Sequence, residues 1–343
     1  EKHTHTGKKK KTREQGDFIR RDKPHREGPR GTAHLLVHAL EGAHNEFAGK
    51  FRLLRAVFAE ERDLIPCEEV KIVGPVTSRD GCWRVAAGQW QGTQVGLKIA
   101  QIRDCNIRKS RTFIRNELRL LRSVHHPCID RFYGASLDLE TGQICLVLDP
   151  LPSLTFGAYI GSKEPDEAER VQMLINISLA LRHLHQRTVP IVHGGLTDAK
   201  VVVDSLSQGP GPRCKLLSFA FSHSADRSHR DLSGGGWPYQ PPELFASEVV
   251  RPTPAIDIFA LGGLMYLAAS SKRPFHGASL IDVQESAIAG RPLSPDWGAQ
   301  AYVRGAWRYL PQLCMHPQPR ERPGAVDAQL ALQGLVTGPP TGL

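Results

Sequence analysis

The sequence predicts an α+β fold in which strands precede helices. Between residues 69 and 148, short runs rich in β-branched and aromatic residues surround one amphipathic helical stretch, Lys109–Ser123. From residue 152 to residue 334 the apolar residues recur mostly at helical spacing. Strands gathered in one part of a chain and helices in another are typical of α+β proteins. The expected strands are Val70–Val73, Trp83–Gln89, Val95–Ala100 and Ile144–Leu148.

Length and composition are those of a globular chain. It has 343 residues, of which 40% are hydrophobic and 23% charged, so it can bury a full core. No apolar run approaches the roughly 18 residues of a membrane-spanning helix, which predicts no membrane span. The seven cysteines form no C-x-x-C pair, which argues against a zinc site and a disulfide framework. We therefore expect a reducing compartment inside the cell, with the cytoplasm preferred and an organelle as the alternative.

Positive charge is concentrated at the amino terminus. The net charge is +9, and residues 1–30 hold eleven Lys or Arg against five Asp or Glu. Residues 1–31 are polar and aperiodic, which predicts an arm that is disordered or ordered only by a partner. The run Lys8, Lys9, Lys10 and Lys11 could neutralise the phosphates of a nucleic acid or meet an acidic protein surface. The alternative is a solvated tail, because lysine runs have low specificity.

A helical extension is expected over residues 32–66. Its apolar residues recur at helical spacing, Thr32 can cap the helix, and Pro66 ends it. Gly42 and Gly49 leave open whether the segment forms one helix or two. The extension could pack on the strand-rich part, which we favour slightly, or it could dock a partner.

One eight-residue stretch organises the rest of the chain. His193-Gly194-Gly195-Leu196-Thr197-Asp198-Ala199-Lys200 stands between a helical pattern and the apolar run Val201–Val203. It resembles the catalytic loop of protein kinases, H-R-D-L-x-x-x-N. Further matches follow in the order and spacing of that family. They are Lys98 at the V-A-I-K lysine, Glu117 at its helical partner, Ser218-Phe219-Ala220 at D-F-G, Gly236–Glu243 at the end of the activation segment, Asp257–Gly262 in the central helix and Cys314–Pro323 at the late C-x-x-x-x-P-x-x-R-P signature.

The resemblance covers residues 69–334 and implies the bilobal protein-kinase fold, in its tyrosine-kinase-like group. It predicts a small β-rich lobe with one helix at residues 67–148 and a large helical lobe at residues 149–334. Residues 335–343 would form a tail.

Several positions that handle phosphate in this family carry other residues here. The general base corresponds to Gly195, and the two metal ligands correspond to Lys200 and Ser218. Glycine cannot take a proton, and a lysine ammonium repels Mg²⁺. The resemblance therefore implies a degenerate member, a pseudokinase that is not an enzyme and holds no metal. The three glycines of the family's phosphate loop are replaced by Ser78, Asp80 and Trp83.

Two nearby carboxylates could be considered as substitutes for the missing base, Asp198 and Asp204. Asp198 stands at the family's proline position and is expected to face solvent or to cap a turn. We therefore do not expect either residue to restore the chemistry.

Lys98 and Glu117 keep the residue types of the family. Their usual role there is to hold ATP, so binding of ATP without Mg²⁺ is one interpretation. The alternative, which we favour, is an ion pair that joins the lobes. The resemblance gives structural roles to four further residues, His193, Glu243, Asp257 and Arg322.

The expected function is binding, as a scaffold or structural subunit with protein partners. The chain could also belong to a large assembly, which it would contact through the basic residues 1–31. The alternatives are a weak or atypical protein kinase and a nucleotide-binding allosteric regulator of an active kinase, since a fold does not decide a function.

Overall fold

The structure is a computed structural model. It describes residues 63–80, 83–101, 107–138, 141–150, 154–204, 211–225, 236–246, 251–289 and 306–337. Contacts divide the chain into residues 1–46 and 47–343, and every described residue belongs to the second unit. The predictions for the arm 1–31, for Lys8–Lys11 and for most of the extension 32–66 lie outside the described residues.

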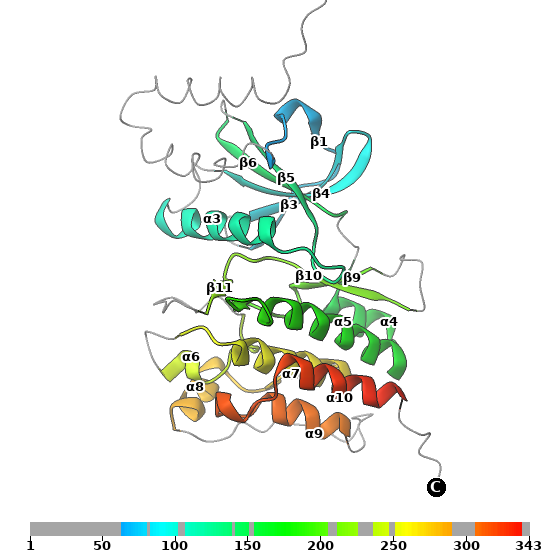
Figure 1. Ribbon diagram of the computed structural model, residues 1–343, viewed down its shortest axis with the longest axis vertical. Helices are drawn as coiled ribbons and strands as arrows, with labels where there is room; N and C mark the ends of the chain where they lie inside the picture. Colours follow the sequence, from blue (N-terminus) through cyan, green and yellow to red (C-terminus); the bar gives the residue numbers. More distant parts are fainter. Residues whose placement is uncertain are drawn as a thin grey trace, which may run out of the picture. The chain divides into compact units, whose positions relative to one another are not determined.

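Six strands form one antiparallel sheet (Figure 1), in the order β1-β3-β4-β6-β5 with β2 paired to β3. Trp83 and Val85 are buried while Arg84 between them is exposed, as expected for a strand with one buried and one solvent-exposed face. The register of β3 and β4 sets Val85 opposite Lys98. The strands are β1 (Val70–Ile72), β2 (Thr77–Asp80), β3 (Trp83–Trp90), β4 (Thr93–Gln101), β5 (Phe132–Asp138) and β6 (Gln143–Leu148).

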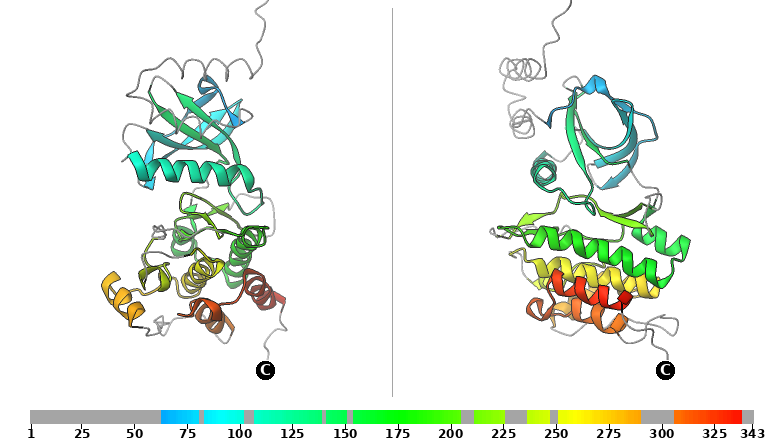
Figure 2. Two further views of the ribbon diagram at one scale, coloured as in Figure 1. Left: turned by 60° about the vertical axis from the view of Figure 1, so that its left-hand side comes forward. Right: turned by 45° about the vertical axis from the view of Figure 1, so that its right-hand side comes forward.

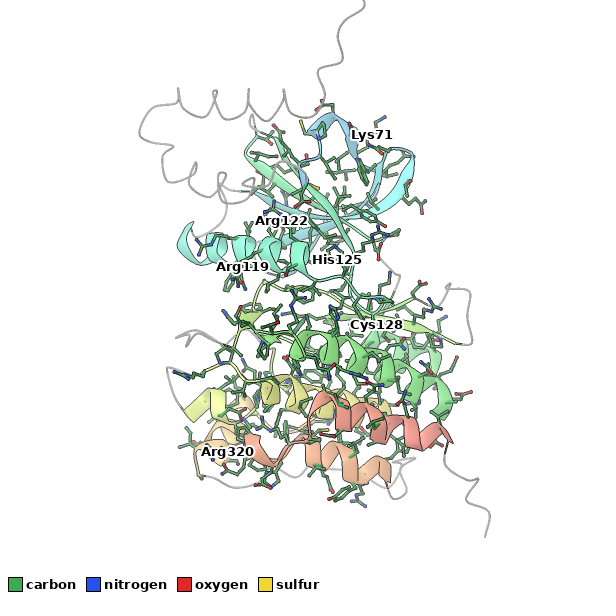
Figure 3. The ribbon with its side chains drawn as sticks, viewed as in Figure 1. Lys71, Arg119, Arg122, His125, Cys128 and Arg320 are labelled. Atoms are coloured by element: carbon green, nitrogen blue, oxygen red, sulfur yellow. The ribbon has the colours of Figure 1, made fainter. Side chains whose placement is uncertain are left out.

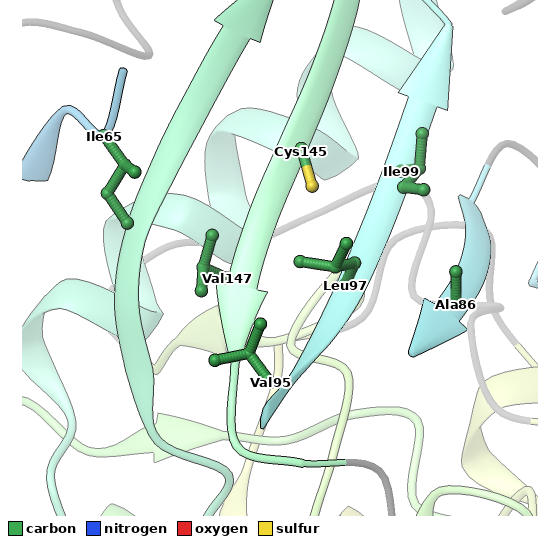
Figure 4. Close-up of a cluster of buried hydrophobic side chains, with 7 residues drawn as sticks. All are labelled: Ile65, Ala86, Val95, Leu97, Ile99, Cys145 and Val147. Atoms are coloured by element: carbon green, nitrogen blue, oxygen red, sulfur yellow. The ribbon is translucent and has the colours of Figure 1, made fainter. Parts of the chain in front are cut away.

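The sheet has a hydrophobic core of its own. Ile65, which precedes β1, packs into it and donates a backbone hydrogen bond of 2.9 Å to the carbonyl of Ala135. The core therefore begins before the first strand of the sheet. Its buried members are Ile65, Ala86, Val95, Leu97, Ile99, Cys145 and Val147 (Figure 4).

Helix α3 (Ile107–Ser123) lies beside the sheet (Figures 1 and 2). Ile114 and Leu118 are buried and Arg115 and Arg119 are exposed, so one face of the helix packs and the opposite face is solvated. Arg122, near the end of the helix (Figure 3), forms an ion pair of 2.8 Å between its Nε and Oδ2 of Asp63. The helix is thus tied to the chain that leads into the sheet.

The second lobe is helical, with α5 and α7 at its centre (Figure 2). Every residue of α7 from Ile256 to Ala269 is buried. Helix α5 starts with a capping box, in which Asp166 and Glu169 each accept from the other's backbone N–H. The helices are α4 (Phe156–Lys163), α5 (Glu167–His185), α6 (Glu243–Ala246), α7 (Pro254–Ser270), α8 (Leu280–Ile288), α9 (Ala306–Cys314) and α10 (Ala325–Thr337), with 3₁₀ turns at Cys67–Glu69 and Pro319–Glu321.

Two small sheets lie on the face of the helical lobe that is turned toward the strand-rich lobe (Figure 1). They carry the segments that match the family motifs, because the loop between β8 and β9 holds residues 193–200 and the segment after β10 holds Ser218. The strands are β7 (Leu154–Thr155), β9 (Val201–Asp204) and β10 (Arg213–Leu216) in one sheet, and β8 (Ile191–Val192) and β11 (His223–Ser224) in the other.

The predicted α+β fold, with a strand-rich lobe followed by a helical lobe, is confirmed. Among the described residues, no helix combines the length and the hydrophobicity that crossing a membrane requires. The five cysteines in the same part of the chain are all unpaired: Cys67, Cys128, Cys145, Cys214 and Cys314.

Candidate functional site

A small pocket lies between the two lobes. Its volume is about 60 Å³, and most of its wall is aliphatic. The polar side chains around it are Lys98, Glu117, Asp130, Lys200 and Ser218. Ionisable groups gathered in an apolar pocket are the usual mark of a functional site. The aliphatic wall consists of Val85, Leu97, Leu121, Leu148, Ala199 and Leu217.

The ion pair between Lys98 and Glu117 lies in the wall of this pocket. The Nζ of Lys98 lies 2.6 Å from Oε1 of Glu117 and 3.3 Å from Oγ of Ser218. The same Oε1 accepts a hydrogen bond of 3.1 Å from the backbone N–H of Phe219. Glu117 is 1% exposed, so β4, α3 and the segment after β10 meet at one buried carboxylate.

Trp83 stands beside Lys98. It stands at the third glycine position of the family's phosphate loop, and its side chain is only 1% exposed. Its ring centroid lies 5.2 Å from the Nζ of Lys98, which is a cation–π distance. The indole therefore covers the ammonium group that the family uses for phosphate.

The three positions that the family uses for the base and for the metal do not form an oxygen ligand set. Gly195 has no side chain, Ser218 accepts from Lys98, and the Nζ of Lys200 lies 4.6 Å from the centroid of the Phe221 ring. Mg²⁺ selects carboxylate and other oxygen ligands. These residues do not fit that ion, and the described residues contain no other group of three metal-binding side chains.

The pocket in this conformation does not fit a nucleotide either. Sites for ligands of that size enclose roughly 300–1,000 Å³, whereas this pocket holds about 60 Å³. The ammonium of Lys98 is already engaged by Glu117 and by the ring of Trp83.

Asp257 fixes the loop that leads to Gly195. Its Oδ2 accepts a hydrogen bond of 2.8 Å from the backbone N–H of His193, and its Oδ1 accepts one of 2.9 Å from that of Gly194. Oδ2 also lies 2.8 Å from Nε2 of His185. One buried carboxylate of α7 thus holds the loop and the end of α5.

The backbone of this loop explains one departure from the family pattern. Gly194 has a φ of +68°, and a Cβ there would lie 2.6 Å from the carbonyl oxygen of Phe221. A side chain larger than glycine at this position would therefore clash as well as strain the backbone.

His193 is fully buried in the helical lobe. Its Nε2 lies 3.1 Å from the carbonyl oxygen of Leu217, and its own carbonyl accepts from Oγ of Ser222. Burial lowers the pKa of His193 to about 4. The neutral imidazole is therefore the native form near pH 7.

Asp198 does not face solvent, so the first of the two alternatives predicted for it is wrong. Its carboxylate is buried, and Oδ2 accepts hydrogen bonds of 3.1 and 2.9 Å from Nε and Nη2 of Arg273. The close packing of Asp198 on α4 leaves no room for a Cβ at Gly157. No sequence signal pointed to this partner, because Arg273 lies 75 residues further along the chain.

Glu243 and Arg322 form a two-pronged ion pair in the helical lobe. Nη1 and Nη2 of Arg322 each lie 2.7 Å from one oxygen of Glu243. Nε of Arg322 donates 2.8 Å to the carbonyl of His316. The pair joins the short helix α6 to the segment before α10.

Asp130 is a pocket residue that the sequence analysis missed. It precedes β5, lines the pocket and is 6% exposed. Burial, followed by the charge of Asp149, raises its pKa to about 8. The available signal was a charged residue placed between Ile129 and the apolar start of a strand.

The predicted polyanion contact at Lys8–Lys11 lies outside the described residues, as do the side chains of Ser78 and Asp80. A larger hollow of about 370 Å³ lies in the helical lobe, between the start of α5 and Trp307. It contains none of the residues matched to the family motifs.

Comparison with known proteins identifies the family. The model of the protein kinase domain matches residues 81–332. The chain is 25% identical over 276 residues to the probable serine/threonine-protein kinase drkD of Dictyostelium discoideum, covering 80% of this chain and 20% of that protein. It is 23% identical over 278 residues to the probable serine/threonine-protein kinase drkB of the same organism, covering 80% and 38%.

A plant protein is similar to the same degree. The chain is 25% identical over 246 residues to the serine/threonine-protein kinase CTR1 of Arabidopsis thaliana, covering 66% of this chain and 28% of that protein. The chain thus spans between a fifth and two fifths of the length of these three relatives.

These findings overturn one prediction. The replacements at Gly195, Lys200 and Ser218 led to the expectation that the chain is not an enzyme. The matched family model is that of the protein kinase domain, and the relatives are named as protein kinases. That expectation rested on single motif positions, whereas the protein kinase domain matches over 252 residues and not only at its motifs. The chain belongs to the protein kinase family.

Proposed function

We propose that this chain is a kinase-family protein whose main role is to bind other proteins, as a scaffold or structural subunit. The observation that carries the proposal is the filled pocket between the lobes. Trp83 covers Lys98, and about 60 Å³ remains where a nucleotide needs several times that volume. A groove occupied by the chain's own side chains leaves the outer surface as the functional part.

Contacts between the lobes support a fixed binding shape. Glu117 of α3 accepts from Lys98 and from the backbone of Phe219. Nδ2 of Asn116, on the same helix, donates to the backbone carbonyls of Ala220 and Ser222. Helix α3 is therefore bonded to the helical lobe at two successive residues, and a partner would meet one surface made from both lobes.

The basic amino terminus supports an additional contact. We propose that residues 1–31 meet an acidic protein surface or a nucleic acid, because six of the nine net positive charges fall within residues 1–30. The motif spacing supports assignment to the tyrosine-kinase-like group. The unpaired cysteines among the described residues support a reducing compartment.

A thermal-shift titration with ATP tests the filled pocket. We expect no rise in the melting temperature of the wild-type chain, with or without Mg²⁺, because ligand binding stabilises only where the ligand fits. Trp83→Val should uncover Lys98 and permit a shift with ATP. Trp90→Val is the matched control, since Trp90 lies on the same strand and Trp83, not Trp90, is the ring that stands against the Nζ of Lys98. A clear ATP shift in the wild-type chain would overturn the proposal.

Affinity purification tests the partners. The full chain and a chain without residues 1–31 would be compared at low and high salt. Partner binding that depends on the arm should weaken steeply as salt rises. Recovery of the same partners from both chains at every salt concentration would remove the arm from the proposal.

The second candidate function is phosphoryl transfer to a serine or threonine. It is supported by the names of the relatives, which are those of serine/threonine-protein kinases. The test is transfer of labelled γ-phosphate to the chain itself and to a generic protein substrate. Transfer that is lost in Lys98→Met but kept in Lys215→Met would establish this function in place of the first.

A further inference from the structure

Asp130 is a buried acid without a structural partner. Its backbone N–H donates to the carbonyl of Leu216 at 3.0 Å, which fixes the main chain. Its side chain is 6% exposed, and no hydrogen bond or ion pair of its carboxylate is found among the described residues. Removing a carboxylate from water without a partner is strongly unfavourable. A residue that destabilises the fold in this way is a candidate for binding or chemistry.

The nearby charges do not neutralise Asp130, because they are already paired with one another. Nζ of Lys98 lies 2.6 Å from Glu117, and Nζ of Lys215 lies 2.5 Å from Asp149. These four residues are the charges that act on Asp130. Each of these two ion pairs is neutral by itself, so no positive charge remains to balance the carboxylate of Asp130.

A second unpaired acceptor lies in the same pocket. Oε1 of Glu117 accepts from Lys98 and from Phe219, but Oε2 is buried and has no hydrogen-bond partner within the described part of the chain. Glu117 and Asp130 both line the pocket, and Glu117 is close enough to raise the pKa of Asp130. Buried polar atoms are nearly always satisfied, so the unpaired Oε2 of Glu117, beside a carboxyl group that has no hydrogen-bond partner among the described residues, indicates a missing donor.

We propose that this pocket binds a compact amidinium or amine group, whose N–H donors are taken by Asp130 and by Oε2 of Glu117. An amidinium presents several N–H donors in one plane and suits carboxylates. About 60 Å³ admits a group of a few heavy atoms, and the aliphatic wall of Val85, Leu121 and Leu148 admits its hydrocarbon part. The group is either a free small cation or the tip of a longer ligand that enters from the cleft. The proposal does not depend on the protein-binding role proposed above.

Lys200 also lines the pocket and would oppose a cation placed beside it. Its ammonium stands over the ring of Phe221, and it is not among the charges that act on Asp130. The amidinium should therefore bind at the Asp130 end of the pocket, away from Lys200.

The test uses acetamidinium as the probe and acetate as its isosteric control, because acetate replaces every donor with an acceptor. Binding to the full chain would be followed by ligand-observed NMR and by melting temperature. We expect acetamidinium to bind and acetate not to bind. Affinity should increase as the pH rises through about 8, where Asp130 loses its proton. Benzamidinium is the second probe, and tighter binding than acetamidinium would assign the group to the tip of a longer ligand.

Two variants separate binding from folding. Asp130→Asn keeps the size of the side chain, and Asp130→Leu replaces the acid with an apolar group. Both should bind acetamidinium at least about tenfold more weakly and lose the pH dependence, and the leucine variant should melt at a higher temperature than the wild type. Glu285→Gln removes one charge from the exposed surface of α8 and should bind as the wild type does.

Three results would overturn the proposal. The first is that the wild-type chain does not bind acetamidinium at millimolar concentration, in which case water alone satisfies the two acceptors. The second is equal binding by the wild type and by Asp130→Leu. The third is a lower melting temperature of Asp130→Leu, which would give the carboxylate a structural role.

Discussion

Replacing Lys98 with methionine should destabilise the fold more than any other single lysine replacement among the described residues. The change removes the main partner of Glu117, which is 1% exposed and keeps only the hydrogen bond from Phe219. Removing one member of a buried ion pair typically costs about 3–5 kcal/mol, because it leaves the other charge buried without compensation. Methionine keeps the length and the apolar stem of lysine, so little packing is lost. We therefore expect the free energy of unfolding to fall by about 3 kcal/mol or more.

The measurement is urea denaturation of a double-mutant cycle made of Lys98→Met, Glu117→Gln and both together. Glutamine keeps an oxygen for the N–H of Phe219 and removes the charge. The double variant should therefore be more stable than Lys98→Met alone, which shows coupling between the two residues. Lys215→Met is the control, because its pair with Asp149 is more exposed and should be worth about 1 kcal/mol or less. Equal losses for Lys98→Met and Lys215→Met would refute the reasoning.

Three further predictions concern the helical lobe. Asp257→Asn offers only one acceptor to the two backbone N–H groups of His193 and Gly194, so it should cost about 2 kcal/mol of unfolding free energy by denaturation and speed amide exchange at Gly194. Unchanged exchange would contradict this. Arg322→Lys loses the two-pronged contact with Glu243 and should lower the free energy of unfolding by about 2–4 kcal/mol. The loss would be measured as a lower melting temperature. A loss under about 1 kcal/mol would show that the pair does not behave as a buried one. The pKa of His193 lies near 4 in the native state and near 6.5 in the unfolded chain. Between these values the unfolded chain binds a proton that the native state does not. The free energy of unfolding should therefore fall as the pH drops from about 6.5 to about 4. His193→Gln should remove up to about 1.4 kcal/mol per pH unit of that slope in urea titrations, and an identical slope in both chains would exclude the assignment.

Local pattern and motif spacing were sufficient to predict the fold and the pairing of distant positions. Runs rich in β-branched and aromatic residues located β3 and β4, and the resemblance to protein kinases identified Lys98 and Glu117 as a pair. The first depends on local residue composition, and the second on the order of motif positions along the chain.

The parts that were missed depend on side-chain direction and on distant partners. Trp83 was placed at a glycine position of the family's phosphate loop, but the sequence does not show that its indole stands over Lys98. The partner of Asp198 could not be predicted, because Arg273 reaches it only after the helical lobe has packed. Asp130 is buried by its neighbours in space and not by its neighbours in sequence.

The beginning of the strand-rich lobe has a practical consequence for any fragment of this protein. A fragment that starts at residue 67 would lack Ile65, and with it the backbone bond to Ala135. It would also leave Arg122 without the carboxylate of Asp63, although its side chain is only 12% exposed. Strand β5 is the last strand of its sheet. Losing the bridge between Leu64 and Ala135 would expose the backbone N–H and C=O groups of this edge strand, which could then pair with other molecules. Truncations intended for expression should therefore start upstream of Asp63, and aggregation is the expected result when they do not.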